Sequence, residues 1–266
     1  MSNQTVNLLM VGLSGSGKTT YLAGLFHTLS EASDEELCLR GLPEQREYLL
    51  TLERRWLDLR QIKHSAHVGP QHVELPIRDA QGRSLDLLLP DISGEEYREA
   101  WESGGFSEEI ADLLETSSGL MLFVHSENVD EPKLLDVRAP RPASQKPETW
   151  HPKMGVTQAK LCDLLEQIIE LRGGNLPPVA VVISAWDTVG DGLAPEQWLP
   201  WRLPLLAQWL ASTDLPFVHK LFAISAQGGD LSDPDTRARL ANAPRIGRPG
   251  GVHDLTAPLQ WLLDAQ

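Results

Sequence analysis

Eight consecutive residues near the start of the chain have the types and spacing of a phosphate-binding loop. They read Gly12-Leu13-Ser14-Gly15-Ser16-Gly17-Lys18-Thr19 and match G-x-x-x-x-G-K-[ST] without a gap. Glycines at these positions let the backbone curl, so that successive N–H groups face a phosphate at the start of a helix. The residues expected to bind the phosphates are Ser14, Gly15, Ser16, Gly17, Lys18, Thr19 and Thr20.

Two side chains of this motif carry the chemistry. We expect the ammonium of Lys18 to reach the β- and γ-phosphates, where its charge would stabilise the reacting groups. We expect the hydroxyl of Thr19 to ligate Mg²⁺. The alternative is a glycine- and serine-rich loop that matches the pattern by chance.

A second motif, Asp91-Ile92-Ser93-Gly94, follows an apolar segment in the middle of the chain. A carboxylate at the end of a parallel strand faces the phosphate-binding loop, so Asp91 could hold a Mg²⁺-bound water. Gly94 would offer its N–H to the γ-phosphate and act as a pivot. The alternative for these four residues is an ordinary turn.

Two later segments could recognise a base. Asp187 ends Ser184-Ala185-Trp186-Asp187, and its carboxylate could accept hydrogen bonds from N1–H and the 2-amino group of guanine. Ser225 and Ala226 follow the next apolar segment and could place backbone N–H groups near guanine O6. Taken singly, each segment could equally be a helix cap or a turn.

These motifs need a sheet whose strands end at one common edge. Apolar runs alternate with helical periodicity along the chain, which predicts an α/β fold. We expect a three-layer, doubly wound and mostly parallel sheet, with a helical insertion before the second strand and a Pro-rich loop insertion. The expected strands are 5–11, 72–77, 84–89, 119–124, 178–184 and 217–224. The expected helices are one from residue 18, then 43–63, 106–115, 157–171, 195–210 and 256–263, and we expect Pro200 and Pro204 to break or kink the helix over 195–210. Residues 126–155 are expected to be loop, and 230–248 mostly loop.

Composition narrows the class of protein. The 266 residues include 23 Lys and Arg against 37 Asp and Glu, so the formal net charge is −14. Such acidity argues against a partner nucleic acid and against an anionic membrane surface. Cys38 and Cys162 are far apart, the first residues lack a basic signal region, and no apolar run approaches the ~18 residues of a membrane span. We therefore expect a single cytoplasmic domain over residues 1–266.

Taken together and in order, the four motifs resemble the P-loop GTPases of the translation-factor and Ras-like class. More narrowly, the sequence is similar to the bacterial "double-GTPase" domains of conflict and defence systems. That narrower similarity rests on residues 157–158 leading into 161–165, and on 181–187, 203–210, 224–231 and 253–263. The resemblance implies a molecular switch that binds GTP and GDP with Mg²⁺, and a protein effector or a second GTPase as partner.

The chain departs from the usual pattern of that class at two places. Guanine-specific domains usually read N/T-K-x-D, whereas Ser184 and Ala185 replace the amide and the lysine here. Trp186 could cover the base in place of the lost lysine stem, or could pack in the core. Without the usual residues, the preference of the site for GTP over ATP stays open. Glu95 stands where the water-orienting Gln is common, so we assign it to catalysis with slow intrinsic turnover, on the order of 10⁻⁴ to 10⁻² s⁻¹.

Three further questions stay open at this level. Ser65 is the only hydroxyl residue between Thr51 and Ser84, so it is the default γ-phosphate-sensing ligand of Mg²⁺. Otherwise Mg²⁺ would take only Thr19, phosphates and waters. Arg98 could be an arginine finger in cis or a residue of a surface helix. The rival functions are an ATPase or small kinase, and a nonhydrolysing scaffold that binds a nucleotide.

Overall fold

Seven strands form one sheet in the part of the chain that the computed structural model describes. That part comprises residues 4–33, 36–62, 73–79, 81–82, 84–89, 92–132, 151–190, 192–212, 217–242 and 253–265. The strand order is β2-β3-β4-β1-β5-β6-β7. The strands are β1 (Gln4–Val11), β2 (Cys38–Leu39), β3 (Glu74–Arg78), β4 (Ser84–Leu88), β5 (Gly119–His125), β6 (Val179–Ser184) and β7 (His219–Ala223).

The pairing makes five adjacent strands parallel. β1 lies between β4 and β5 and is parallel to both, and β5, β6 and β7 continue in the same direction. At one edge β3 is antiparallel to both of its neighbours, β4 and the two-residue β2, so β3 alone runs against the other strands. The predicted α/β fold with a mostly parallel sheet is confirmed, while the short edge strand β2 was not predicted. The parallel strands all end at one edge, which is where the sequence motifs lie.

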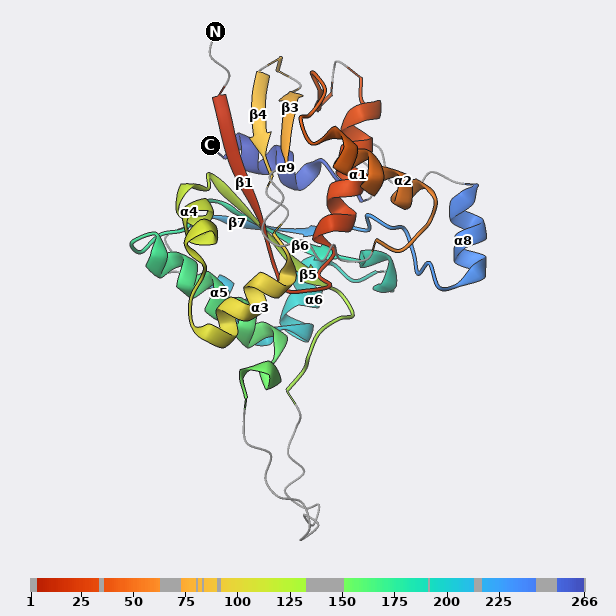
Figure 1. Cartoon of the computed structure of the whole chain (residues 1–266). Coiled ribbons are helices and arrows are strands. Elements are labelled where there is room, and N and C mark those ends of the chain that lie inside the picture. Colours follow the sequence, from red (N-terminus) through yellow and green to blue (C-terminus); the bar gives the residue numbers. More distant parts are fainter. Residues whose placement is uncertain are drawn as a thin grey trace.

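Helices cover both faces of the sheet (Figure 1). The helices are α1 (Lys18–Glu31), α2 (Arg46–Leu57), α3 (Gly94–Ser103), α4 (Glu108–Thr116), α5 (Thr157–Leu171), α6 (Pro195–Arg202), α7 (Pro204–Leu210), α8 (Pro234–Ala241) and α9 (Ala257–Asp264). Alternate residues of β1 pack into different cores. Leu8 and Met10 join the helices α1, α2 and α9, whereas Leu9 and Val11 join α3 to α7. The arrangement is three-layered, as predicted.

Several predicted boundaries were wrong. The helix predicted over 43–63 spans only Arg46–Leu57. The break predicted at Pro204 within 195–210 is confirmed, because α6 ends at Arg202 and α7 begins at Pro204, whereas Pro200 lies inside α6. Helix α3 was expected only as the surface helix in the alternative for Arg98, and α8 was not predicted. A signal for α8 was present in the sequence, because Asp233 caps it by accepting hydrogen bonds from Asp235 N and Thr236 N.

The Pro-rich insertion is described only at its two ends, residues 126–132 and 151–155, before the Val156 cap of α5. A 3₁₀ turn, η1 (Pro152–Met154), lies where the sequence predicted only loop. It is fastened to α3, because Trp101 Nε1 donates to Pro152 O at 2.8 Å. Throughout the described ranges, every helix falls short of the length and apolar character that crossing a membrane requires.

Candidate nucleotide-binding site

The loop between β1 and α1 is wrapped around its own lysine. Lys18 is only 6% exposed, and its Nζ donates to Gly12 O at 2.6 Å and to Leu13 O at 3.3 Å. Nζ also lies 5.5 Å from the centroid of the Tyr97 ring. A Cβ at Gly12 would lie 2.6 Å from Phe123 O, so this tight loop requires glycine there. The loop is therefore a preformed curl with a positive charge at its centre.

The start of α1 is suited to bind an anion. Gly17 caps the helix with φ +95°, and the first turn contains no acidic side chain. Tyr21 N donates to Gly17 O at 2.9 Å, so the amides that precede Tyr21 project from the helix start. Ser16 Oγ is buried and has no hydrogen-bond partner among the described residues. The helix dipole and these donors favour a phosphate at this end.

The structure places Gly94 directly against this loop. A Cβ on Gly94 would lie 2.2 Å from Ser14 N and 2.6 Å from the carbonyl carbon of Leu13. Gly94 is also the first residue of α3, so the start of that helix leans on the phosphate-binding loop. Asp91 and Ser65, the other two expected residues on this side, lie outside the described residues.

The two carboxylates after Gly94 point in different directions. Glu95 is exposed and accepts a 2.6 Å hydrogen bond from Arg98 Nε, so it is held in an ion pair on the surface of α3. Arg98 also bonds Glu102 at 2.5 Å, as expected for a residue of a surface helix. Glu96 Oε2 is buried without a partner among the described residues. Burial raises the pKa of Glu96, and the backbone of Ser93 and, to a smaller extent, the charge of Lys18 oppose that rise.

The predicted base-recognition residues come together at the ends of β6 and β7. Ser225 is fully buried, and its hydroxyl donates to the carboxylate of Asp187 while accepting from Gly228 N at 3.0 Å. The loop is held from its other side as well, because Trp56 Nε1 donates to Ala226 O at 2.8 Å. Asp187 is exposed and is therefore oriented by Ser225 while remaining accessible to a ligand.

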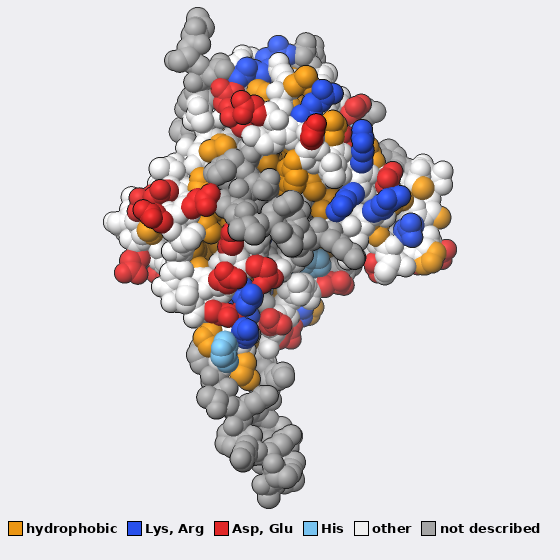
Figure 2. All heavy atoms as spheres, in the orientation of Figure 1, with side chains coloured by type: hydrophobic (Ala, Val, Ile, Leu, Met, Phe, Trp, Pro, Cys, Tyr) orange, Lys and Arg blue, Asp and Glu red, His pale blue; other side chains and the backbone are white. Residues whose placement is uncertain are grey.

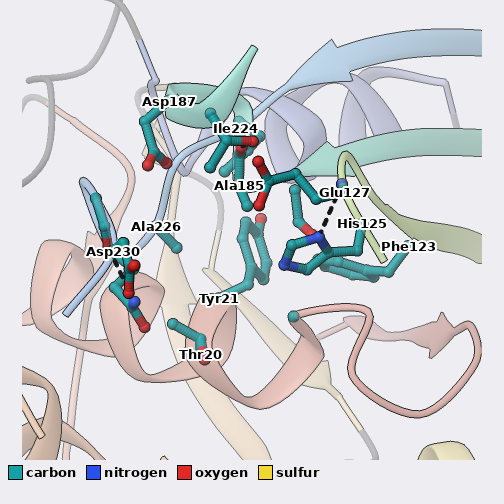
Figure 3. Close-up of a pocket in the computed structure, with 15 residues that line it drawn as sticks. Thr20, Tyr21, Phe123, His125, Glu127, Ala185, Asp187, Ile224, Ala226 and Asp230 are labelled. Carbon is teal, nitrogen blue, oxygen red and sulfur yellow. Dashed lines mark hydrogen bonds between the residues drawn. The ribbon is translucent and has the colours of Figure 1, made fainter. Parts of the chain in front are cut away.

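A cavity of about 180 Å³ lies between Asp187 and the start of α1 (Figure 3). It exceeds the roughly 150 Å³ that holds a benzene ring in an engineered core, so it admits a planar ring system. Gly17 and Thr20 line it at the helix start, and Ala226 lines it from the β7 loop. The cavity thus connects the phosphate-binding loop to the carboxylate expected to read a base.

The unusual residues before Asp187 have distinct structural roles. Ser184 Oγ donates to Ser16 O at 2.7 Å, which ties the end of β6 to the phosphate-binding loop. Ala185 lines the cavity with a φ of +53°. Trp186 is partly buried and packs against the core, with its ring centroid 6.2 Å from that of Trp198, and it does not line the cavity. The core alternative for Trp186 is therefore the correct one.

His125 lines the cavity and was missed in the sequence. It is the last residue of β5, directly after the apolar run Leu120–Val124. A polar ring that ends a buried parallel strand faces the ligand edge of the sheet, which was the available signal.

Comparison with known protein families agrees with the geometry. The model of the family described as Double-GTPase 1 matches residues 9–262, from β1 through α9. The chain belongs to the Double-GTPase 1 family. Among curated proteins, no sequence matches this chain. The resemblance to double-GTPases is thereby confirmed. The family name suggests a GTPase that binds a guanine nucleotide.

Proposed function

We propose that this protein is a Mg²⁺-dependent GTPase that acts as a slow molecular switch. The observation that supports it best is the cavity, because it spans from Gly17 and Thr20 to Asp187. This supports a site in which the groups that we propose to bind phosphate and base lie at two ends of one cavity, as a nucleotide requires. Lys18 and the amides of the loop bind the phosphates, and Asp187 with the Ser225–Ala226 loop reads guanine.

The donor set fits Mg²⁺. No cluster of three or more His, Cys, Asp or Glu side chains that could hold a metal occurs in the described ranges. Mg²⁺ usually takes only one or two protein oxygens and completes its shell with phosphates and waters. Thr19, in the first turn of α1, supplies a hydroxyl beside the phosphate site. Thr19 would hold the ion directly, with Ser65 as its other expected ligand and Asp91 expected to hold a Mg²⁺-bound water. The ion would neutralise charge on the phosphates.

We propose slow hydrolysis on the geometry of α3. Gly94 contacts the loop through its backbone, which suits it to sense the γ-phosphate. Glu95, the residue we assigned to catalysis from the sequence, is instead paired with Arg98 on the surface. Glu95 would have to leave Arg98 to orient water, so turnover is slow until a partner reorganises α3.

The surface around α3 and α4 suggests the chemistry of that partner. Residues 94–116 contain eight acidic side chains and one basic side chain. Figure 2 shows acidic side chains gathered over these helices. An effector or a second GTPase that docks here would present a basic surface. On the resemblance alone, we also propose that the protein functions in a bacterial conflict system.

The test of the proposed function is base recognition by Asp187. Asp187→Asn should weaken GTP binding and improve binding of xanthosine triphosphate, because an amide can donate to the 2-oxo group of xanthine. The matched control is Asp230→Asn, since Asp230 also lines the cavity but is engaged with Ser232. Titration of each variant with GTP, XTP and ATP in Mg²⁺ measures the preference. An unchanged preference in Asp187→Asn, or a wild-type preference for ATP, would contradict the proposal.

Single-turnover phosphate release then separates a switch from a nonhydrolysing scaffold. Wild-type protein that binds GTP and releases no phosphate over days would contradict the hydrolysis step while leaving nucleotide binding intact.

A further inference from the structure

The imidazole of His125 is held in one orientation by the backbone. Its Nδ1 accepts hydrogen bonds from Glu127 N and Asn128 N, each at 3.1 Å. Two N–H donors at Nδ1 require that this nitrogen be unprotonated, so the neutral ring carries its proton on Nε2. Figure 3 shows the other ring nitrogen directed toward Tyr21 and the interior of the cavity. The ring therefore presents a neutral N–H donor to whatever the cavity holds.

His125 is also the ring of the cavity wall that a ligand can reach. Tyr21 and Phe123 line the same cavity but are each only 1% exposed, and the Tyr21 hydroxyl already donates to Leu255 O at 2.7 Å. His125 is partly exposed. A nucleoside in this cavity would thus meet His125 ahead of the two buried rings.

The neighbouring strand leaves room for this ring. His125 pairs with Ser184 in the register of β5 and β6, and Ala185 is the next residue. Ala185 contributes only a methyl group to the cavity, at the position where the usual N/T-K-x-D pattern carries a lysine. Side chains at positions 125 and 185 therefore enter the same cavity from adjacent strands.

Resting on the proposed function, we propose that His125 takes the place of that lysine. It covers the bound guanine nucleoside on the side of β5 and donates a hydrogen bond to it from Nε2. Base reading remains with Asp187 in the 3₁₀ turn Trp186–Thr188 that follows β6. The nucleoside is thus held from the end of β5 on one side and from the turn after β6 on another. His125 is a binding and specificity-determining residue, and hydrolysis does not pass through it.

The test is the pair His125→Asn and His125→Asn with Ala185→Lys, measured by calorimetric titration of the whole chain with GDP and Mg²⁺. Asn offers an acceptor near the position of Nδ1, so it preserves the turn at Glu127 and Asn128 while removing the ring and its donor. We expect the single variant to bind GDP roughly tenfold more weakly, the size of one lost hydrogen bond. Lysine at position 185 should restore the affinity to within about threefold of wild type, which a purely structural role of His125 does not predict.

The matched control is His219→Asn, the same substitution at an exposed histidine that does not line the cavity. It should bind GDP as wild type does. Equal GDP affinity of His125→Asn and wild type would overturn the inference, as would a weakened variant that lysine at 185 does not rescue. Wild-type protein that fails to bind GDP overturns the proposed function and this inference together, whereas the other two outcomes overturn the inference alone.

Discussion

The contact between Gly94 and the phosphate-binding loop permits a sharp prediction. The nearest atoms to a Cβ on Gly94 are backbone atoms, Ser14 N at 2.2 Å and Ser14 Cα at 2.3 Å. No side-chain rotation can relieve a clash with backbone. In Gly94→Ala, ordinary contact at 3.4 Å therefore requires the start of α3 to move from the loop by about 1.2 Å.

A displacement of that size has separable consequences. Misplacing a group near the reacting atoms by about 1 Å can lower a rate about 100-fold, so we expect a loss of that order in GTP hydrolysis. GDP has no γ-phosphate for Gly94 to sense, so GDP affinity should change little. Overpacking should also lower the free energy of unfolding by about 1–3 kcal/mol.

Single-turnover phosphate release, GDP titration and thermal melting measure these three effects. The matched control is Gly105→Ala, because a Cβ on Gly105, just beyond the other end of α3, meets nothing within 4 Å. Gly94→Ala protein that melts and hydrolyses GTP as wild type does would refute the close packing of α3 on the loop. Reduced stability with unaltered hydrolysis would refute only the role of Gly94 at the γ-phosphate.

Two other predictions concern stability. Ser184→Ala removes the 2.7 Å hydrogen bond to Ser16 O and leaves a buried carbonyl unsatisfied. It should therefore lower the free energy of unfolding by about 1–3 kcal/mol and weaken GDP binding, whereas Ser103→Ala at an exposed position should do neither. Equal melting temperatures of Ser184→Ala and wild type would contradict the tie between β6 and the loop. Burial lowers the pKa of His125 below its ordinary value of 6.5, against the opposing charges of Glu127 and Asp187. Below about pH 6.5 the unfolded chain takes up a proton at His125 more readily than the folded chain does, so the free energy of unfolding decreases as the pH is lowered. In His125→Asn this part of the decrease should be missing from melting temperatures measured against pH. Parallel pH profiles of the variant and the wild type would contradict this prediction.

Much of this protein follows from local sequence alone. The phosphate-binding loop, the helix that begins at Lys18 and the strands around them are encoded by contiguous residues, because glycine spacing and hydrophobic periodicity act over a few positions. The parallel sheet also follows, since buried runs such as Val179–Ser184 are apolar on both faces. The resemblance carried by the motifs led to the family itself.

The tertiary structure decided which side chains share the site. Glu95 and Glu96 are neighbours in the sequence, yet one pairs with Arg98 at the surface and the other turns inward, because α3 assigns them different faces. Trp186 stands beside Asp187 but packs against the core, and His125 enters the cavity from a strand about sixty residues away. Such placements depend on contacts between distant segments, which no local pattern encodes. Sequence fixes where a strand ends, and only the packed sheet determines which side chains meet there.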